Sequence, residues 1–308
     1  MGKVLFIRGG AVGDFILTLP AIKLMRDCLP ENEIEILGYP SITELATTTG
    51  LADRTRSIED ARLATFFAPG AKLDEEWCDY FSSFDVVVSY LYDPDGYFSG
   101  NLEKAGVKTL LRGIFRPEES EPFVSASRQL ARPLETLALF LEDPAPALDY
   151  EKTENTFPGN PVIALHPGSG SPSKNWSFES WANVIKGISE KHHEAHFLIT
   201  AGEAELERIE QFHALIDPLG ISWESVSGKS LTDLASLYRS IDFYLGHDSG
   251  ISHLAASAGS KGLLLFGPTN PSIWAPETNR MEIIASPSKS LGDISVAQVL
   301  DRIELSTS

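Results

Sequence analysis

The chain has 308 residues, of which 43% are hydrophobic and 22% are charged, which is typical of a soluble protein with one or two domains. Its 25 basic and 43 acidic side chains give a net charge of -18, which argues against a general nucleic-acid-binding role. It has no run of about 18 uncharged apolar residues, no secretory pattern at its start and only two cysteines, so we expect a cytoplasmic protein.

The first half alternates short apolar runs with helical patterns. KVLFIR (3–8), EIEILGY (33–39) and FDVVVSYL (84–91) predict strands, and AIKLMRDCL (21–29) has apolar residues close to helical spacing. Alternation of this kind indicates an α/β domain with a parallel sheet covered on both faces.

The second half repeats the scheme, with apolar strands that each run into a small or polar loop. These segments are PVIALHPG (161–168), AHFLITAG (195–202), DFYLGHDSG (242–250) and KGLLLFGPTN (261–270). We therefore predict two doubly wound domains, 1–145 and 161–308, joined by a linker at 146–160 that is rich in proline and charge. In such sheets ligands bind at the carboxyl ends of the strands. The last helix is a candidate to pack back on the first domain.

The loop after the first predicted strand is similar to a dinucleotide-binding loop but does not match one. If Gly10 and Gly13 are aligned with the last two glycines of G-x-G-x-x-G, Arg8 stands where the first glycine belongs. The second strand also lacks the acidic residue that would bind a ribose. A nicotinamide cofactor is therefore not expected. Asp14, which ends this loop, is either a helix cap or a functional carboxylate.

Two loops of the second half have the chemistry of a phosphate site. Asp248, Ser249 and Gly250 fall at the start of a predicted helix, where free N–H groups and the helix dipole favour an anion. The alternative is that Asp248 only caps that helix. Lys174 precedes another helix, which Ser177 is expected to cap, and it is either a phosphate ligand or an ordinary exposed lysine.

Asp93 and Asp95 in YDPDGY have the D-x-D spacing of some metal-dependent transferases. Because they flank Pro94 and precede Gly96, a turn is the favoured interpretation, and no metal site is expected.

Four segments, taken in this order and spacing, resemble the heptosyltransferases of glycosyltransferase family 9, which belong to the two-domain GT-B class. They are GDFILTLPAI (13–22), HPGSGSPSKNWSFESWANVI (166–185), GHDSGISHLAASAG (246–259) and LFGPTNPSIWAP (265–276). The resemblance implies two Rossmann-like domains that face each other across a cleft, the first binding the acceptor and the second the nucleotide sugar. It also implies inverting, metal-independent transfer of heptose from ADP-heptose to an acceptor hydroxyl of lipopolysaccharide or a related cell-envelope glycan, with no cofactor and at most peripheral association with the cytoplasmic membrane.

The same resemblance implies roles for individual residues. Asp14 is the general base. Asp93 and Asp95 follow a predicted strand of the first domain, and this position suggests that they belong, with Gly13, to the acceptor side of the cleft. The donor-binding residues are Lys174, Ser169, Asp248, Ser249, Gly250, His253 and Glu205, with Glu203 as an alternative to Glu205.

The sequence departs from the family pattern at two positions. His247 stands where asparagine or a small residue is usual, and Asn270 stands where aspartate is usual. These departures bear on the donor sugar, and the acidic first half suggests a different acceptor. Two other functions stay open, a nucleotide-sugar epimerase and a non-catalytic sugar-nucleotide-binding protein. The family motifs argue against the first, and the retained Asp14 argues against the second.

Overall fold

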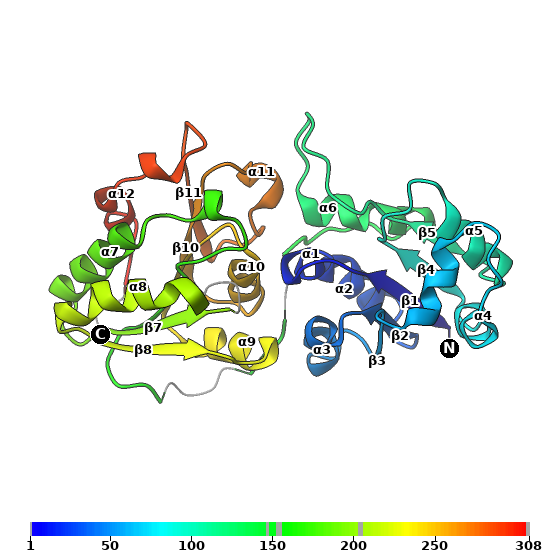
Figure 1. The fold of residues 1–308 in the computed structure, drawn as a ribbon, viewed down its shortest axis with the longest axis horizontal. Coiled ribbons are helices and arrows are strands. Elements are labelled where there is room, and N and C mark those ends of the chain that lie inside the picture. The colour runs from blue at the N-terminus through cyan, green and yellow to red at the C-terminus, as the bar shows by residue number, and fades with distance from the viewer. Residues whose placement is uncertain (1, 146–147, 152–155, 203–205, 306–308) are drawn as a thin grey trace. The chain divides into compact units, whose positions relative to one another are not determined.

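The structure is a computed structural model that describes residues 2–145, 148–151, 156–202 and 206–305. The chain divides into two compact units, Met1–Pro146 and Ala147–Ser308, and each is a layered α/β structure (Figure 1). Among the described residues, no helix is both long and apolar enough to span a bilayer.

The first unit is built on a parallel five-stranded sheet in the order β3-β2-β1-β4-β5. Its strands are β1 (Lys3–Arg8), β2 (Glu33–Gly38), β3 (Arg54–Ser57), β4 (Val86–Ser89) and β5 (Leu110–Arg112). Its helices are α1 (Val12–Ile16), α2 (Leu19–Cys28), α3 (Pro40–Thr48), α4 (Glu75–Ser82), α5 (Tyr97–Lys104) and α6 (Ala126–Ala131), with short 3-10 helices η1 (Ala61–Phe67) and η2 (Arg132–Leu137). The three strands predicted for this half are confirmed.

Strand β1 lies at the centre of this sheet, which explains its apolar sequence. Ile7 pairs in register with Leu37 of β2 and with Ser89 of β4. Helices cover both faces of a parallel sheet, so the side chains of a central strand are apolar on both faces. The chain reverses its direction across the sheet between β1 and β4, so the ligand crevice of this unit is expected at their carboxyl ends.

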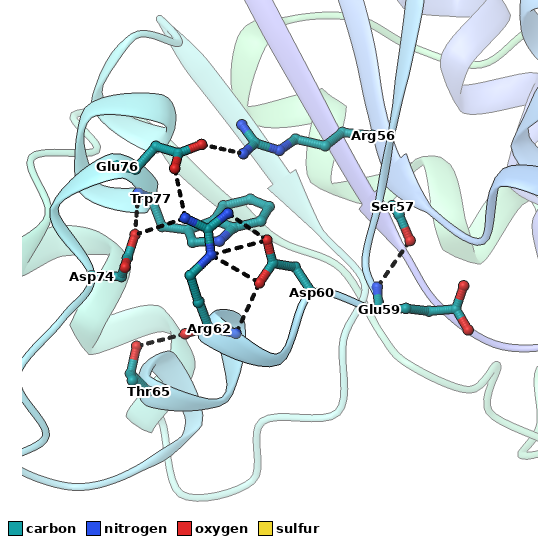
Figure 2. A network of polar contacts seen from close by, with 9 residues as sticks. All are labelled: Arg56, Ser57, Glu59, Asp60, Arg62, Thr65, Asp74, Glu76 and Trp77. Atoms are coloured by element: carbon teal, nitrogen blue, oxygen red, sulfur yellow. Dashed lines mark hydrogen bonds and ion pairs between the residues drawn. The ribbon is translucent and has the colours of Figure 1, made fainter.

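A polar network fastens η1 to α4 at the surface of this unit (Figure 2). Arg62 lies 2.7 Å from a carboxylate oxygen of Asp60 and 3.9 Å from Asp74, and it also bonds Glu76. Arg56 donates to the other oxygen of Glu76, at 3.1 Å. Hydrogen bonds from the side chain and the backbone N–H of Arg62 hold the pKa of Asp60 at about 2. Its two arginines and three carboxylates bond one another, which makes the network a structural feature.

The second unit has a parallel six-stranded sheet in the order β11-β10-β9-β6-β7-β8. Its strands are β6 (Val162–Leu165), β7 (His196–Ala201), β8 (Ser222–Ser227), β9 (Phe243–His247), β10 (Gly262–Phe266) and β11 (Met281–Ala285). Its helices are α7 (Phe178–Lys191), α8 (Leu206–Ile216), α9 (Leu231–Ser240), α10 (Gly250–Ser257), α11 (Pro271–Trp274) and α12 (Val296–Leu300), with 3-10 helices η3 (Pro172–Lys174), η5 (Asp217–Leu219) and η6 (Leu291–Asp293). The reversal of direction here falls between β6 and β9.

The last helix belongs to the second unit. Helix α12 packs against α7, where Val299 is fully buried and a side chain added at Gly187 would meet Leu300. The apolar face of this helix is therefore covered by its own unit.

Part of the predicted linker is also attached to the second unit. Leu148 is buried, and its N–H donates to the carbonyl of Ser257 at 2.8 Å. The Arg239 side chain donates to the carbonyl of Tyr150 at 3.2 Å. The segment around residues 148–150 is thus part of the folded surface, although its composition suggested a free connection.

Candidate functional site

Two distant segments of the second unit and the following helix α10 converge on Asp248, which directly follows β9. Its Oδ2 accepts hydrogen bonds from Lys174 Nζ at 2.7 Å and from Thr269 Oγ1 at 2.6 Å. Its Oδ1 lies 4.0 Å from His253 Nε2. The carboxylate is almost fully buried, with 6% of the Asp248 side chain exposed, whereas 30% of Lys174 is exposed. The site therefore presents a cation to solvent above a buried anion.

Asp248 does not cap α10, so the capping alternative for it is wrong. Ser249 is the N-cap, and its hydroxyl accepts from the N–H of Ser252 at 3.2 Å. Gly250 is the first helical residue, and the start of α10 lies directly after Asp248. Backbone N–H groups at a helix start bind anions, and a glycine there lets an anion approach closely.

The loop before α7 is held by internal hydrogen bonds that position Lys174. The Ser169 hydroxyl lies 2.8 Å from the carbonyl of Ser171 and 2.7 Å from the Asn175 side chain, so in this structure it supports the loop. Ser177 caps α7 as expected, because its hydroxyl accepts from the N–H of Ser180 at 3.0 Å.

His247 is a buried anchor of the same loop. Its Nε2 accepts from the backbone N–H of Trp176 at 2.9 Å and from Trp181 Nε1 at 3.1 Å, which requires a ring without a proton on that nitrogen. Burial, reinforced by nearby His166, lowers the pKa of His247 to about 3. The residue departs from the family pattern, but its complete burial gives it a packing role. Asn270 caps α11 by accepting from Ser272 N–H at 3.0 Å.

A pocket of about 200 Å³ lies at the carboxyl ends of β6, β7 and β8. His166, Thr200, Gly228 and Ile251 contribute to its lining, and Ile251 belongs to the first turn of α10. The His166 ring is bonded to Thr200 Oγ1 at 3.1 Å, and burial lowers its pKa to about 4. Glu205 and Glu203, the two expected ribose ligands, lie outside the described residues.

In the first unit, Asp14 is the third residue of α1, directly after Gly13. Its Oδ2 accepts from the N–H of Ala11 at 2.9 Å, so the carboxylate does stabilise the helix start, from inside the first turn. Gly10 has a φ of +99°, and a Cβ there would lie 2.6 Å from Asp14 Oδ2. A larger residue at position 10 would therefore clash with the Asp14 carboxylate, so this position requires glycine. The Asp14 side chain keeps 38% of its surface exposed.

Arg8, which stands where a dinucleotide-binding loop has its first glycine, lies beside Asp14. Arg8 Nη2 is 3.6 Å from Asp14 Oδ1, and the Arg8 side chain is 1% exposed. Thr269 was not predicted as a site residue either. A charged residue at the end of an otherwise apolar central strand was the available signal for Arg8, whereas nothing in the sequence pairs Thr269 with Asp248.

The D-x-D motif is a turn, as favoured. Asp93 accepts from the N–H groups of Phe98 and Ser99 at 3.0 and 2.9 Å and from the Ser99 hydroxyl, so it stabilises the start of α5. Desolvation opposes ionisation of Asp93, but these bonds and nearby Arg112 lower its pKa. Asp95 is exposed in the turn. In the described parts of the chain, no three His, Cys, Asp or Glu side chains are grouped to hold a metal ion.

Asp93 also borders a pocket of about 410 Å³ within the first unit. Tyr92 and Phe115, both largely exposed, lie on its wall with ring centroids 5.6 Å apart. Arg112 from the end of β5 adds a positive charge. Aromatic faces and a cation are suited to a polar ring such as a sugar.

Comparisons with known proteins agree on one family. The model of glycosyltransferase family 9 (heptosyltransferase) matches residues 110–301. Lipopolysaccharide heptosyltransferase 1 of Pseudomonas aeruginosa is 24% identical over 288 residues, which cover 87% of this chain and 79% of that protein.

Two solved structures share the fold over nearly the whole chain. A family 9 glycosyl transferase from Veillonella parvula superimposes with a TM-score of 0.77 at 17% identity, covering 97% of this chain and 95% of that one. ADP-heptose lps heptosyltransferase II of E. coli gives 0.76 at 16% identity, covering 97% and 96%. The predicted GT-B class with two Rossmann-like domains is confirmed. Because the family model matches more than half of its residues, the chain belongs to glycosyltransferase family 9.

Proposed function

We propose that this glycosyltransferase transfers heptose from ADP-heptose to a hydroxyl of lipopolysaccharide or a related cell-envelope glycan, at the cytoplasmic face of the membrane. The names of its relatives support this donor and this acceptor class. The observation that carries the proposal is the convergence of Lys174, Asp248 and Thr269 beside the start of α10.

The donor diphosphate binds to Lys174 and to the backbone N–H groups at the start of α10. The exposed ammonium and the helix start supply positive potential, which stabilises the negative charge that grows on the departing ADP. The adjoining pocket that includes His166 and Ile251 takes the nucleoside. These groups stabilise the leaving group without a metal ion.

Asp14 of the first unit acts as general base. The acceptor oxygen attacks the anomeric carbon from the face opposite the diphosphate, its proton passes to the Asp14 carboxylate, and the bond from the anomeric carbon to the diphosphate oxygen breaks with its electron pair leaving on ADP. Attack from the opposite face inverts the anomeric configuration. The exposure of Asp14 supports this role, because a base must reach its substrate.

The acceptor glycan binds in the pocket of the first unit that Tyr92, Phe115 and Arg112 line. A sugar ring can stack on the exposed aromatic side chains, and Arg112 can hydrogen-bond its polar substituents. Asp93 supports this pocket by holding α5, and Asp95 lies in the neighbouring exposed turn.

Nucleotide selectivity tests the donor assignment. ADP should raise the melting temperature of the protein more than UDP or GDP does at equal concentration, because a ligand present at 100 times its Kd stabilises the folded state by about 2.7 kcal/mol. Adenosine is the control that separates recognition of the base from recognition of the diphosphate. A larger shift with UDP would refute ADP-heptose as the donor and leave family membership untouched.

A further inference from the structure

Arg8 is a buried cation at the switch point of the first sheet. It is the last residue of β1, next to β4, and its side chain is 1% exposed. Burial lowers the pKa of Arg8, while the neighbouring Asp14 opposes that shift. A guanidinium is strongly disfavoured in such a place unless its donors are used, so its contacts define what the residue does.

The guanidinium ties the Asp14 loop to two other segments. Its Nε donates to the backbone carbonyl of Asp14 at 3.3 Å, and its Nη1 donates to the carbonyls of Phe115 at 3.0 Å and Tyr90 at 3.4 Å. Nη2 is buried without a hydrogen bond among the described residues and lies 3.6 Å from Asp14 Oδ1. One side chain thus contacts both the backbone and the carboxylate of the proposed base.

One carbonyl partner of Arg8, Tyr90, is firmly held in the unit, and another, Phe115, belongs to a pocket wall. Tyr90 is fully buried, its hydroxyl donates to the carbonyl of Leu130 at 2.7 Å, and its ring lies against Gly113 so closely that a Cβ there would be 2.2 Å from it. Phe115 lines the pocket proposed for the acceptor. Arg8 therefore joins the base and the wall of that pocket through one rigid group.

We propose that Arg8 is the positioning residue for Asp14 and that it fixes the carboxylate relative to the acceptor pocket. This inference rests on the proposed function, because it assumes that Asp14 is the base. Only a branched, planar donor can contact three carbonyls and a carboxylate in different directions, so lysine should not replace arginine here.

Arg26 provides a matched control in the same unit. It donates to the carbonyl of Asn32 at 2.9 Å and to the carboxylate of Asp53 at 2.6 Å, so it also combines backbone and carboxylate partners, away from Asp14. Arg8→Lys and Arg26→Lys should both lower the melting temperature. Only a positioning role predicts that Arg8→Lys alone also slows the reaction.

The test measures ADP release from ADP-heptose with heptose-free lipopolysaccharide as the acceptor. Arg8→Lys should lower kcat about 10- to 100-fold, the effect of a small displacement of a reacting group. The donor KM and the melting shift caused by ADP should stay at wild-type values, and Arg26→Lys should retain wild-type kcat. Arg8→Lys with wild-type kcat would overturn the inference.

Two further variants keep the outcome decisive. Adding Arg8→Lys to Asp14→Asn should cause no further loss of kcat, since a positioning residue has nothing left to position. If Arg8→Lys does not fold, Tyr90→Phe removes the bond that fixes a carbonyl partner, and it should lower kcat about two- to fivefold; wild-type kcat in Tyr90→Phe would then refute the role of Arg8. A fully active Asp14→Asn enzyme would refute the proposal that Asp14 is the general base. An inactive Asp14→Asn enzyme together with a fully active Arg8→Lys enzyme would refute only the positioning role of Arg8.

Discussion

Each unit pairs a carboxylate with a cation at its switch point, and the burial of the two partners is reversed between the units. In the first unit the cation is buried and the carboxylate is presented, with 1% of Arg8 and 38% of Asp14 exposed. In the second unit the carboxylate is buried and the cation is presented, with 6% of Asp248 and 30% of Lys174 exposed. The presented member is the one that a ligand can reach.

In the proposed mechanism, the presented groups touch substrate and the buried groups hold them in place. A proton acceptor is needed near the acceptor hydroxyl, and the first unit presents a carboxylate. A positive charge is needed near the diphosphate, and the second unit presents an ammonium. Arg8 donates to three backbone carbonyls and Asp248 accepts from two side chains, which fits a positioning role for each buried partner.

The largest effect should come from changing the presented carboxylate. Asp14→Asn keeps an oxygen that can accept from the N–H of Ala11 but cannot take a proton at neutral pH, so kcat with heptose-free lipopolysaccharide should fall about 10²- to 10⁴-fold. The melting temperature should change by a few degrees at most. ADP affinity should be unaffected, since the donor loops belong to the second unit.

An active Asp14→Asn enzyme would break the comparison, because the presented carboxylate would then only support the start of α1. The search for a base would move to Asp95, since both oxygens of Asp93 are occupied by the start of α5. Asp93→Asn should instead lower stability and raise the acceptor KM by loosening α5, while kcat at saturating acceptor falls far less than in Asp14→Asn.

An intermediate effect should come from changing the presented cation. Lys174→Ala should weaken ADP binding by about 2 kcal/mol, roughly 30-fold, because it removes a charge-assisted contact to phosphate. It also leaves Asp248 buried beside the diphosphate without its main counterion. Calorimetric titration measures the loss, which added Mg²⁺ or Mn²⁺ should not restore.

Lys186→Ala is the matched control for that titration, since Lys186 is an exposed lysine on the neighbouring helix α7, with 57% of its side chain exposed. If Lys174→Ala and Lys186→Ala bind ADP equally well, Lys174 is not a contact of the ligand.

The smallest effect on catalysis and ADP binding should come from the histidine that holds the lysine loop, whose contribution to stability depends on pH. His247 has a pKa of about 3 in the folded protein and about 6.5 in the unfolded chain, so below pH 6.5 only the unfolded state gains this proton. Stability is therefore complete above pH 6.5 and falls by up to about 1.4 kcal/mol per pH unit as the pH decreases toward 3.

His247→Asn sharpens this prediction. Asparagine still offers an oxygen to the N–H groups of Trp176 and Trp181 but is shorter, so the variant should melt a few degrees lower at pH 8. It has no proton to gain, so the difference from wild type should narrow between pH 6.5 and pH 4.5. If the difference in melting temperature between the two proteins stays constant over this pH range, His247 does not cause the loss of stability in acid.

Much of the fold was accessible from the sequence, because it depends on local patterns. Apolar runs marked the central strands, and polar loops after them marked the ends where ligands bind. Asp14 and Asp248 were found because they lie in glycine-containing loops after strands, and Lys174 because it is a cation in a Gly/Ser/Pro-rich loop just before a helix. The roles of these residues in catalysis and donor binding remain predictions.

What the sequence could not provide are the pairings between distant segments. Thr269 meets Asp248 only because β10 lies beside β9, and His247 meets Trp176 only because β9 lies beside β6. Strand order is decided by packing over the whole unit, so no local pattern contains it. Arg8 illustrates the same limit, since its partners lie up to 107 residues away along the chain.

The attachment of residues 148–150 to the second unit has a consequence for protein engineering. Because Leu148 is buried and its N–H is bonded to Ser257, a second unit produced alone from residue 161 would lose a covering segment and expose apolar surface on α10. When second units are exchanged between members of the family, the chains should therefore be joined upstream of Leu148, so that each transplanted unit keeps the segment that covers α10.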